Sequence, residues 1–268
     1  MKVSNKSIFH IVQTIFTGKE DAKNVFDRVW LKNRIELFKK FTLKSLLNQT
    51  NRNFLHWILW RPEEKTEPLV QDLAKFLKEI NYQFVFTFFS TPYFNENQEP
   101  EVVDSLPKRL EKSLEFVKGF HIDEEVVYLT VIDSDDMFYK GATEEIQSYD
   151  YEFKRALYFT KGYAFEIQSK RLAEWNPTTC PPFYTIFQPS EVFFDSIKHL
   201  EYRKGLIFHK HIPKVFNSIP LEGRKFMYGI HSLNDTTFWN NSYKGKEYLD
   251  EKEKVLILKD FGIEYDRI

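Results

Sequence analysis

The segment Tyr128-Leu129-Thr130-Val131-Ile132-Asp133-Ser134-Asp135-Asp136-Met137 bears on both the fold class and the candidate site. Its apolar and β-branched start predicts a buried strand, and three carboxylates follow within four positions. In open α/β sheets, ligands bind beyond the carboxyl ends of the strands. Adjacent carboxylates repel one another unless a cation neutralises them. The segment therefore indicates a site for a hard divalent cation, Mg²⁺ or Mn²⁺, shared with the phosphates of a ligand.

Apolar runs alternate with amphipathic segments upstream of these acids. The predicted strands are Ile8–Ile15, Phe54–Trp60, Phe84–Phe89 and Val126–Ile132. Helical spacing predicts one helix over Trp30–Asn48, a second opened by Pro68 and a third that starts near Pro107. This β-α-β-α-β-α-β order predicts an α/β fold with a mostly parallel sheet, right-handed crossovers and helices on both faces.

The regular alternation ends after Tyr139. Short apolar runs among prolines and polar loops predict a mixed sheet, with Gly162 in a hairpin turn and a helix over Lys246–Lys259. His209 and His211 flank Lys210 in the alternation of one strand face. Because no internal repeat or low-complexity linker interrupts the chain, residues 1–268 are predicted to form one domain.

Charge and cysteine content narrow the class of protein. The 38 Lys and Arg residues nearly cancel the 39 Asp and Glu residues, so no overall positive field attracts nucleic acid. Cys180 is the single cysteine, which fits a reducing compartment. No apolar run approaches the roughly 20 residues that span a bilayer. We therefore expect a cytoplasmic protein without a transmembrane segment or a nucleic-acid partner, and peripheral membrane contact stays open.

A family resemblance sharpens these expectations. The pattern Arg34-x3-Phe38-x2-Phe41-Thr42-Leu43-x-Ser45-Leu46-x2-Gln49-Thr50-x2-Asn53-Phe54 resembles the first helix and second strand of glycosyltransferases with the GT-A fold. Together with Ile132-Asp133-Ser134-Asp135-Asp136, it is most similar to the putative rhamnosyltransferase-like group of bacterial surface polysaccharide synthesis. The resemblance covers roughly the first 170 residues and fades towards the C-terminus.

The resemblance implies a metal-dependent hexosyltransferase that moves a sugar from a nucleotide-sugar donor to a saccharide or other hydroxyl acceptor. A rhamnosyltransferase is the specific type that it suggests. Residues up to about 140 would bind the donor, and residues from about 141 to 268 would face the acceptor. Asp135 would ligate the metal, and Asp133 would bind the donor ribose or the metal through water. Asp136 would steady the loop or a sugar hydroxyl. Arg34 could reach the diphosphate, although an ion pair on the helix surface is an alternative.

Enzymes of this fold often take a further metal ligand from a late histidine. His231 is the favoured candidate, because a short apolar run ends there in a polar cluster; His209 and His211 are alternatives. The catalytic base expected of an inverting enzyme falls on Glu191 or Asp195, each of which could instead be a solvated acid at a helix start. Aromatic platforms for sugar could come from Trp175 and Trp239, or these could be core residues.

Three other interpretations remain open. The acids from Asp133 to Asp136 could form a solvated turn that caps a helix beginning near Tyr139. The chain could be a non-catalytic carbohydrate- or nucleotide-binding protein on the same scaffold. It could also be a metal-dependent nucleotidyltransferase or hydrolase, which likewise places carboxylates at strand ends.

Overall fold

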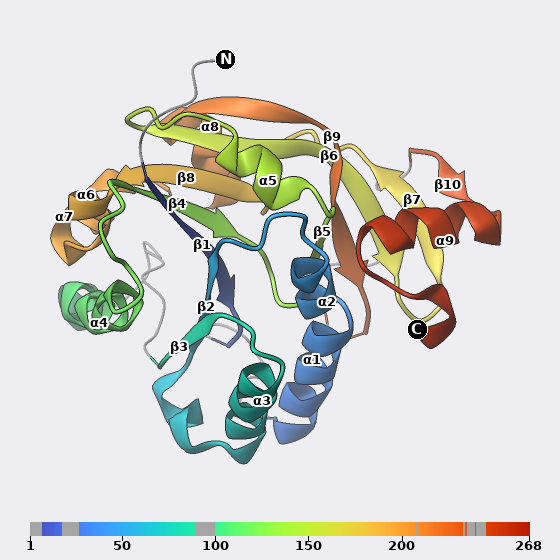
Figure 1. The fold of residues 1–268 in the computed structure, drawn as a ribbon, viewed down its shortest axis with the longest axis horizontal. Helices are drawn as coiled ribbons and strands as arrows, with labels where there is room; N and C mark the ends of the chain where they lie inside the picture. Colours follow the sequence, from blue (N-terminus) through green and yellow to red (C-terminus); the bar gives the residue numbers. More distant parts are fainter. Residues whose placement is uncertain are drawn as a thin grey trace.

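The computed structural model describes residues 7–17, 27–88, 100–206, 208–232, 234, 239 and 245–268, without the side chains of residues 100–106 and 267. The N-terminal half contains four parallel strands in the spatial order β3-β2-β1-β4 (Figure 1). Their bounds are β1 Ile8–Ile15, β2 Leu55–Trp60, β3 Phe84–Phe88 and β4 Val126–Val131. Strands β1, β2 and β4 are buried almost throughout, as expected of parallel strands covered on both faces.

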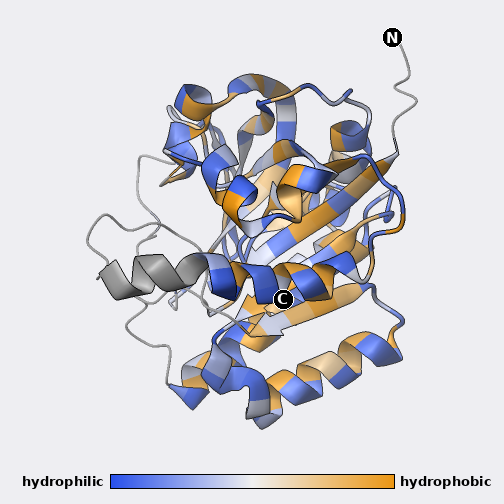
Figure 2. Cartoon of the chain, turned by 90° about the vertical axis from the view of Figure 1, so that its left-hand side faces the viewer, coloured by the Kyte–Doolittle hydropathy of each residue, from blue (hydrophilic) through white to orange (hydrophobic). Residues whose placement is uncertain are grey.

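Helices cover both faces of this parallel part. Their bounds are α1 Arg28–Lys40, α2 Thr42–Leu47, η1 Pro62–Thr66, α3 Pro68–Glu79 and α4 Pro100–Lys118. Helices α1 and α3 pack against Ile58 and Trp60 on one face, whereas α4 packs against Trp57 and Leu59 on the other. Figure 2 shows the apolar strands between helices on which hydrophilic and hydrophobic residues alternate. The predicted parallel strands and helix-covered faces are therefore confirmed.

Local sequence explains where these helices begin. The Asp27 carboxylate accepts hydrogen bonds from the backbone N–H groups of Val29 and Trp30, which caps α1. Glu67 caps α3 through the N–H of Leu69, and Pro68 occupies the first helical position. Pro107 lies inside α4, which begins at Pro100, so the prediction that this helix starts near Pro107 was wrong. The predicted strand residue Phe89 lies outside the described residues.

The C-terminal half adds a mixed sheet. Strand β8 pairs antiparallel with β4, and the sheet continues through β6, β7 and β10, while β9 runs parallel to β6 and pairs with β5. The bounds of these strands are β5 Met137–Phe138, β6 Arg155–Glu166, β7 Arg171–Trp175, β8 Tyr184–Pro189, β9 Asn217–Ile230 and β10 Glu247–Tyr248. The fold is thus the predicted α/β class, with a parallel part of the sheet flanked by helices and a mixed-sheet C-terminal half.

Short helices connect the later strands: α5 Ala142–Gln147, α6 Ser190–Phe193, α7 Ser196–Tyr202, η2 His209–His211, α8 Ile212–Val215, α9 Glu251–Asp260 and η4 Tyr265–Arg267. Two predictions need correction here. His209 and His211 lie in a 3-10 turn rather than on a strand face, and the predicted helix over Lys246–Lys259 is divided into β10 and α9. Within the described part of the chain, no helix has the length and apolar character needed to cross a membrane.

Gly162 lies in the middle of β6 and not in a hairpin turn, which corrects the prediction made from the sequence. It pairs with Trp175 on one side and Phe226 on the other. A Cβ atom at this position would come within 2.5 Å of the Phe226 ring. Glycine is therefore required here by the close approach of β9.

We expect Gly162→Ala to lower the free energy of unfolding by about 1–3 kcal/mol, because the added methyl overpacks the Phe226 ring. Urea denaturation at neutral pH measures the change. Gly119→Ala is the matched control: its Cβ would lie 3.4 Å from the nearest atom, an ordinary contact, and we expect a change within about 0.5 kcal/mol. Equal effects of the two substitutions would contradict this explanation.

Candidate functional site

The acid loop, residues Asp133 to Asp136, connects β4 to β5 and lies at the carboxyl end of the parallel strands, as predicted. The backbone N–H of Asp136 donates to the carbonyl of Asp133, which folds the loop into a turn. Asp135 and Asp136 are buried, and Asp133 is half-buried. The acids do not cap a helix, since α5 begins after Gly141 and has no side-chain cap. The capping-turn interpretation is therefore wrong.

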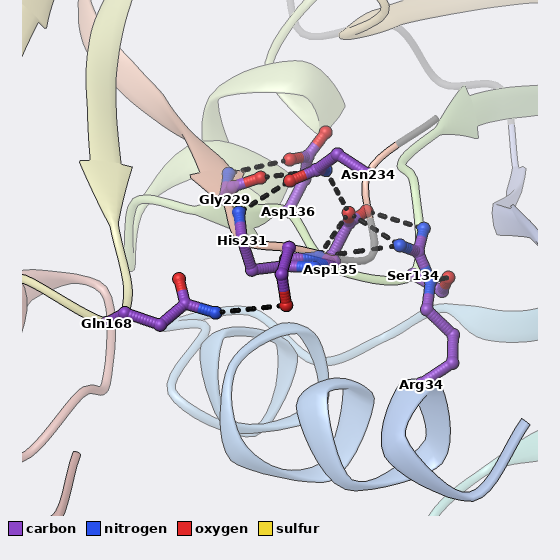
Figure 3. Close-up of polar contacts among 9 residues, drawn as sticks. Arg34, Ser134, Asp135, Asp136, Gln168, Gly229, His231 and Asn234 are labelled. Carbon is purple, nitrogen blue, oxygen red and sulfur yellow. Dashed lines mark hydrogen bonds and ion pairs between the residues drawn. The ribbon is translucent and has the colours of Figure 1, made fainter. Parts of the chain in front are cut away.

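Arg34 of α1 makes the main ion pair of the loop (Figure 3). Its Nη1 and Nη2 atoms donate to Oδ2 and Oδ1 of Asp135, each over 2.8 Å. Its Nε donates to Ser134 Oγ over 2.7 Å. Only 13% of the Arg34 side chain and 5% of the Asp135 side chain are exposed, so this bidentate pair is largely desolvated. Arg34 is thus brought to the acids as predicted, but its partner is Asp135.

The segment after β9 completes the cluster. His231 Nε2 lies 2.9 Å from Asp135 Oδ2, and Asn234 Nδ2 donates to the same oxygen over 2.9 Å. Asn234 also donates to the carbonyl of Gly229 and accepts from the backbone N–H of His231, which fixes this turn beside the loop. The structure therefore brings His231 to Asp135, whereas the metal-ligand role expected of it stays a prediction. Asn234 and Ser134 were missed as members of the cluster, because short polar residues after a strand carry no signal of their own.

Glycine at position 229 permits this approach. A Cβ atom there would lie 2.2 Å from the carbonyl oxygen of Asp135, a distance that real contacts do not reach. The backbone N–H of Gly229 donates to Asp136 Oδ1 over 2.9 Å. Strand β9 and the acid loop are thus joined by backbone contact as well as through Asp135.

The two buried carboxyl groups titrate in opposite directions. Burial pushes the pKa of Asp135 upward, but the charge of Arg34 and the hydrogen bond from His231 outweigh it and leave that pKa below its ordinary value. Burial, followed by the charges of Asp135 and Asp133, raises the pKa of Asp136 well above its ordinary value. Asp136 Oδ2 is buried without a hydrogen-bond partner. Asp136 therefore keeps its proton to higher pH than an ordinary carboxyl group.

The residues predicted to hold a divalent cation do not fit one in this arrangement. Asp135 already accepts hydrogen bonds on both oxygens, and His231 directs at it the ring nitrogen that would otherwise face a metal. Among the described residues, no group of three or more His, Cys, Asp and Glu side chains is arranged to hold a metal ion. Asp133 is the one acid of the loop whose carboxylate has no hydrogen-bond or ion-pair partner within the described part of the chain.

The predicted catalytic acids lie far from the acid loop. Strand β8 runs antiparallel to β4, and its last residue, Pro189, pairs with Val126 at the start of β4. Glu191 and Asp195 follow Pro189, so the length of β4 separates them from Asp135, about 20 Å at 3.3 Å per residue. Asp195 caps α7 by accepting from the N–H groups of Ile197 and Lys198. The structure thus does not bring these acids to the site.

The remaining candidates have structural partners. His209 Nδ1 contacts the backbone carbonyl of Cys180. Trp175 packs edge-on against Phe226 and Tyr228, with ring centroids 5.4 and 5.1 Å away, as a core residue would. Trp239 stacks on the guanidinium of Arg171 at 4.4 Å. The family resemblance also implies that acids or amides after Phe89 cradle the nucleotide base; the segment 89–99 lies outside the described residues.

Comparisons with known proteins agree with the resemblance stated above. The model of a family described as putative rhamnosyl transferase matches residues 9–124, somewhat less than half of the chain. This match confirms the predicted resemblance to that group of GT-A-like glycosyltransferases. It spans most of β1, the helix α1 that carries Arg34, and the elements β2, α3, β3 and α4; β4 and the acid loop lie after it.

A solved structure, a putative nucleotide-diphospho-sugar transferase from Desulfovibrio desulfuricans G20, is similar over 83% of this chain and 80% of that chain. The sequence identity is 10% and the TM-score is 0.35, which is a distant likeness. No curated protein matches the chain.

The opposite titration of the two buried acids predicts different costs for their amide variants. We expect Asp135→Asn to lower the free energy of unfolding at neutral pH by about 3 kcal/mol, because it leaves the Arg34 charge buried without its partner. We expect Asp136→Asn to cost less than about 1 kcal/mol, because burial and the neighbouring acids raise the pKa of Asp136 and so disfavour its charged form. Asp133→Asn, at a half-buried acid without a partner, is the control. Urea denaturation measures all three.

The pH dependence has a definite sign. Because the pKa of Asp135 is lowered on folding, its contribution is present above the unfolded value, about 4, and is lost as pH falls through the folded value. The difference in free energy of unfolding between the native protein and Asp135→Asn should therefore shrink below about pH 4. Because the pKa of Asp136 is raised on folding, the native protein loses stability as pH rises above about 4. The free energy of unfolding of Asp136→Asn should therefore increase relative to that of the native protein over this range. Equal deficits for both variants at every pH would contradict these protonation states.

Proposed function

We propose that the protein is a glycosyltransferase that takes a sugar from a nucleotide-sugar donor and passes it to the hydroxyl of a saccharide or other acceptor. The observation that carries this proposal is the acid loop at the carboxyl end of β4, where α1 and the segment after β9 converge on Asp135. The family match to putative rhamnosyl transferases over residues 9–124 supports the donor half of the proposal. Rhamnosyl transfer in surface polysaccharide synthesis is the specific form we favour.

The arrangement suits departure of a diphosphate. In the proposed reaction, the acceptor oxygen attacks the anomeric carbon, and the bond from that carbon to the diphosphate oxygen breaks. The nucleoside diphosphate leaves with the electron pair and carries additional negative charge. A fixed guanidinium at the carboxyl end of the sheet stabilises that charge more effectively than water, because it needs no reorganisation. Arg34, held by Asp135 and Ser134, is such a group.

Asp133 is the acid we assign to donor contact. Its carboxylate is half-buried and has no partner among the described residues, whereas Asp135 and Asp136 are both engaged. A free carboxylate accepts hydrogen bonds from ribose or sugar hydroxyls, which fixes the donor beside Arg34. Glu191 and Asp195 stay sequence-based candidates for the catalytic base, but their place beyond the other end of β4 gives them no part in this proposal.

The metal dependence expected from the sequence is left out of the proposed mechanism, because the oxygens of Asp135 are already taken. We further propose a cytoplasmic location, in keeping with Cys180 as a buried free thiol. Direct contact with a membrane surface stays a proposal that depends on the acceptor.

Product analysis tests this function. We expect the protein to release nucleoside diphosphate from at least one member of a panel of nucleotide sugars, detected by chromatography. Asp133→Ala should reduce the rate at least about tenfold, since it removes the free carboxylate of the loop. Asp72→Ala, on the exposed face of α3, is the control and should leave the rate unchanged.

The other two classes give different products. Release of pyrophosphate from nucleoside triphosphate and sugar phosphate would indicate a nucleotidyltransferase and contradict the proposal. Binding of nucleotide sugar without any release, in the presence of a range of saccharide acceptors, would indicate a binding protein on the same scaffold.

A further inference from the structure

The protein's own groups already contact two of the three acids of the loop. The guanidinium of Arg34 pairs with Asp135, and the backbone N–H of Gly229 donates to Asp136 Oδ1. Asp133 alone keeps a carboxylate charge without a partner in the described part of the chain. Mutual repulsion of the three acids is the reason for expecting a divalent cation. The pairing of Asp135 with Arg34 reduces that repulsion within the protein itself.

The coordination capacity of Asp135 is also filled. Its Oδ1 accepts from Arg34 Nη2, and its Oδ2 accepts from Arg34 Nη1 and Asn234 Nδ2 and contacts His231 Nε2. An ionised carboxylate offers about four acceptor sites and no donor. The His231 nitrogen that faces it must therefore carry a hydrogen, so it has no lone pair for a metal. A cation could bind Asp135 only after Arg34 had moved away and the His231 ring had turned.

Arg34 keeps the capacity to bind an anion. A guanidinium has five N–H donors. One goes to Ser134, and one from each terminal nitrogen goes to Asp135. His231 Nε2 lies 3.5 Å from Nη1 but carries its own hydrogen, so it does not accept the second N–H of Nη1. The second N–H of Nη2 has no partner among the described residues. The Trp30 ring also contacts the Arg34 side chain: the guanidinium carbon lies 5.9 Å from the centre of that ring, within the range of a cation–π interaction.

We infer that Arg34 takes the place of the divalent cation in the donor site, so that a nucleoside diphosphate binds to this protein without a metal. Asp135, His231 and Asn234 are positioning residues in this arrangement: they hold the guanidinium and do not ligate a cation. The inference rests on the proposed function, because it takes the diphosphate of a nucleotide sugar as the anion.

Calorimetry on the native protein tests the inference directly. UDP, GDP, ADP, CDP and dTDP are each titrated into the full chain, once in excess EDTA and once with Mn²⁺. We expect at least one of them to bind with a dissociation constant that changes less than about threefold between the two conditions. Without nucleotide, the electron paramagnetic resonance signal of free Mn²⁺ should persist when the protein is added.

Substitution of Arg34 provides a second, sharper readout. In EDTA, the diphosphate should bind to Arg34→Gln at least about tenfold more weakly than to the native protein, because the positive charge of the guanidinium is gone. Mn²⁺ should restore binding in this variant, because Asp135 is then free to ligate it. A merely structural role for Arg34 does not produce this new metal dependence. Arg28→Gln is the matched control on the same helix, because the Arg28 side chain is 66% exposed and lies in a surface pair with Glu67.

Each outcome decides a different claim. Binding to the native protein that disappears in EDTA overturns the inference and leaves the proposed function standing. Tight binding of Mn²⁺ to the native protein without nucleotide overturns it as well, and does so even if Arg34→Gln does not fold. Equal binding of Arg34→Gln and Arg28→Gln in EDTA has the same consequence. Failure of all five diphosphates and of a panel of nucleotide sugars to bind, with or without Mn²⁺, contradicts the proposed function itself.

Discussion

The constraint on which the site depends is the repulsion among three carboxylates at the end of one buried strand. Isolated charges in a desolvated position are costly, and removing one partner of a buried pair leaves the other without compensation. The protein meets this constraint in two ways: burial and the neighbouring acids raise the pKa of Asp136 well above its ordinary value, and Asp135 receives a bidentate guanidinium. The positions of α1, the acid loop and the turn after β9 are coupled through these contacts.

The fold brings these segments together from distant parts of the chain. Arg34 and Asp135 are 101 residues apart, and His231 lies a further 96 residues along. Parallel strands place the start of α1 and the end of β4 at the same edge of the sheet. Strand β9 reaches that edge from the C-terminal half, and Gly229 lets its backbone touch the loop. The site therefore belongs to both halves of the domain.

Sequence patterns predicted what depends on local periodicity and direction. The buried strand before Asp133, the parallel half of the sheet and the approach of His231 to the acids were all readable. The sequence did not show which group Arg34 pairs with. A pair such as Arg34 and Asp135 has no local signature, and Arg34 could equally have bound a phosphate. The reversed direction of β8 was also hidden, which is why Glu191 was expected near the acids although it lies beyond the other end of β4. Gly162 suggested a turn because glycine does not distinguish a turn from a close strand crossing.

The most direct measurement of the central claim is a crystal structure of the native protein with a nucleoside diphosphate and MnCl₂, recorded at a wavelength where manganese scatters anomalously. The account predicts the diphosphate beside Arg34, the Arg34–Asp135 pair intact, and no anomalous peak within ligand distance of Asp135. A manganese peak between Asp133 and Asp135, with Arg34 turned away and His231 facing the metal, would contradict it.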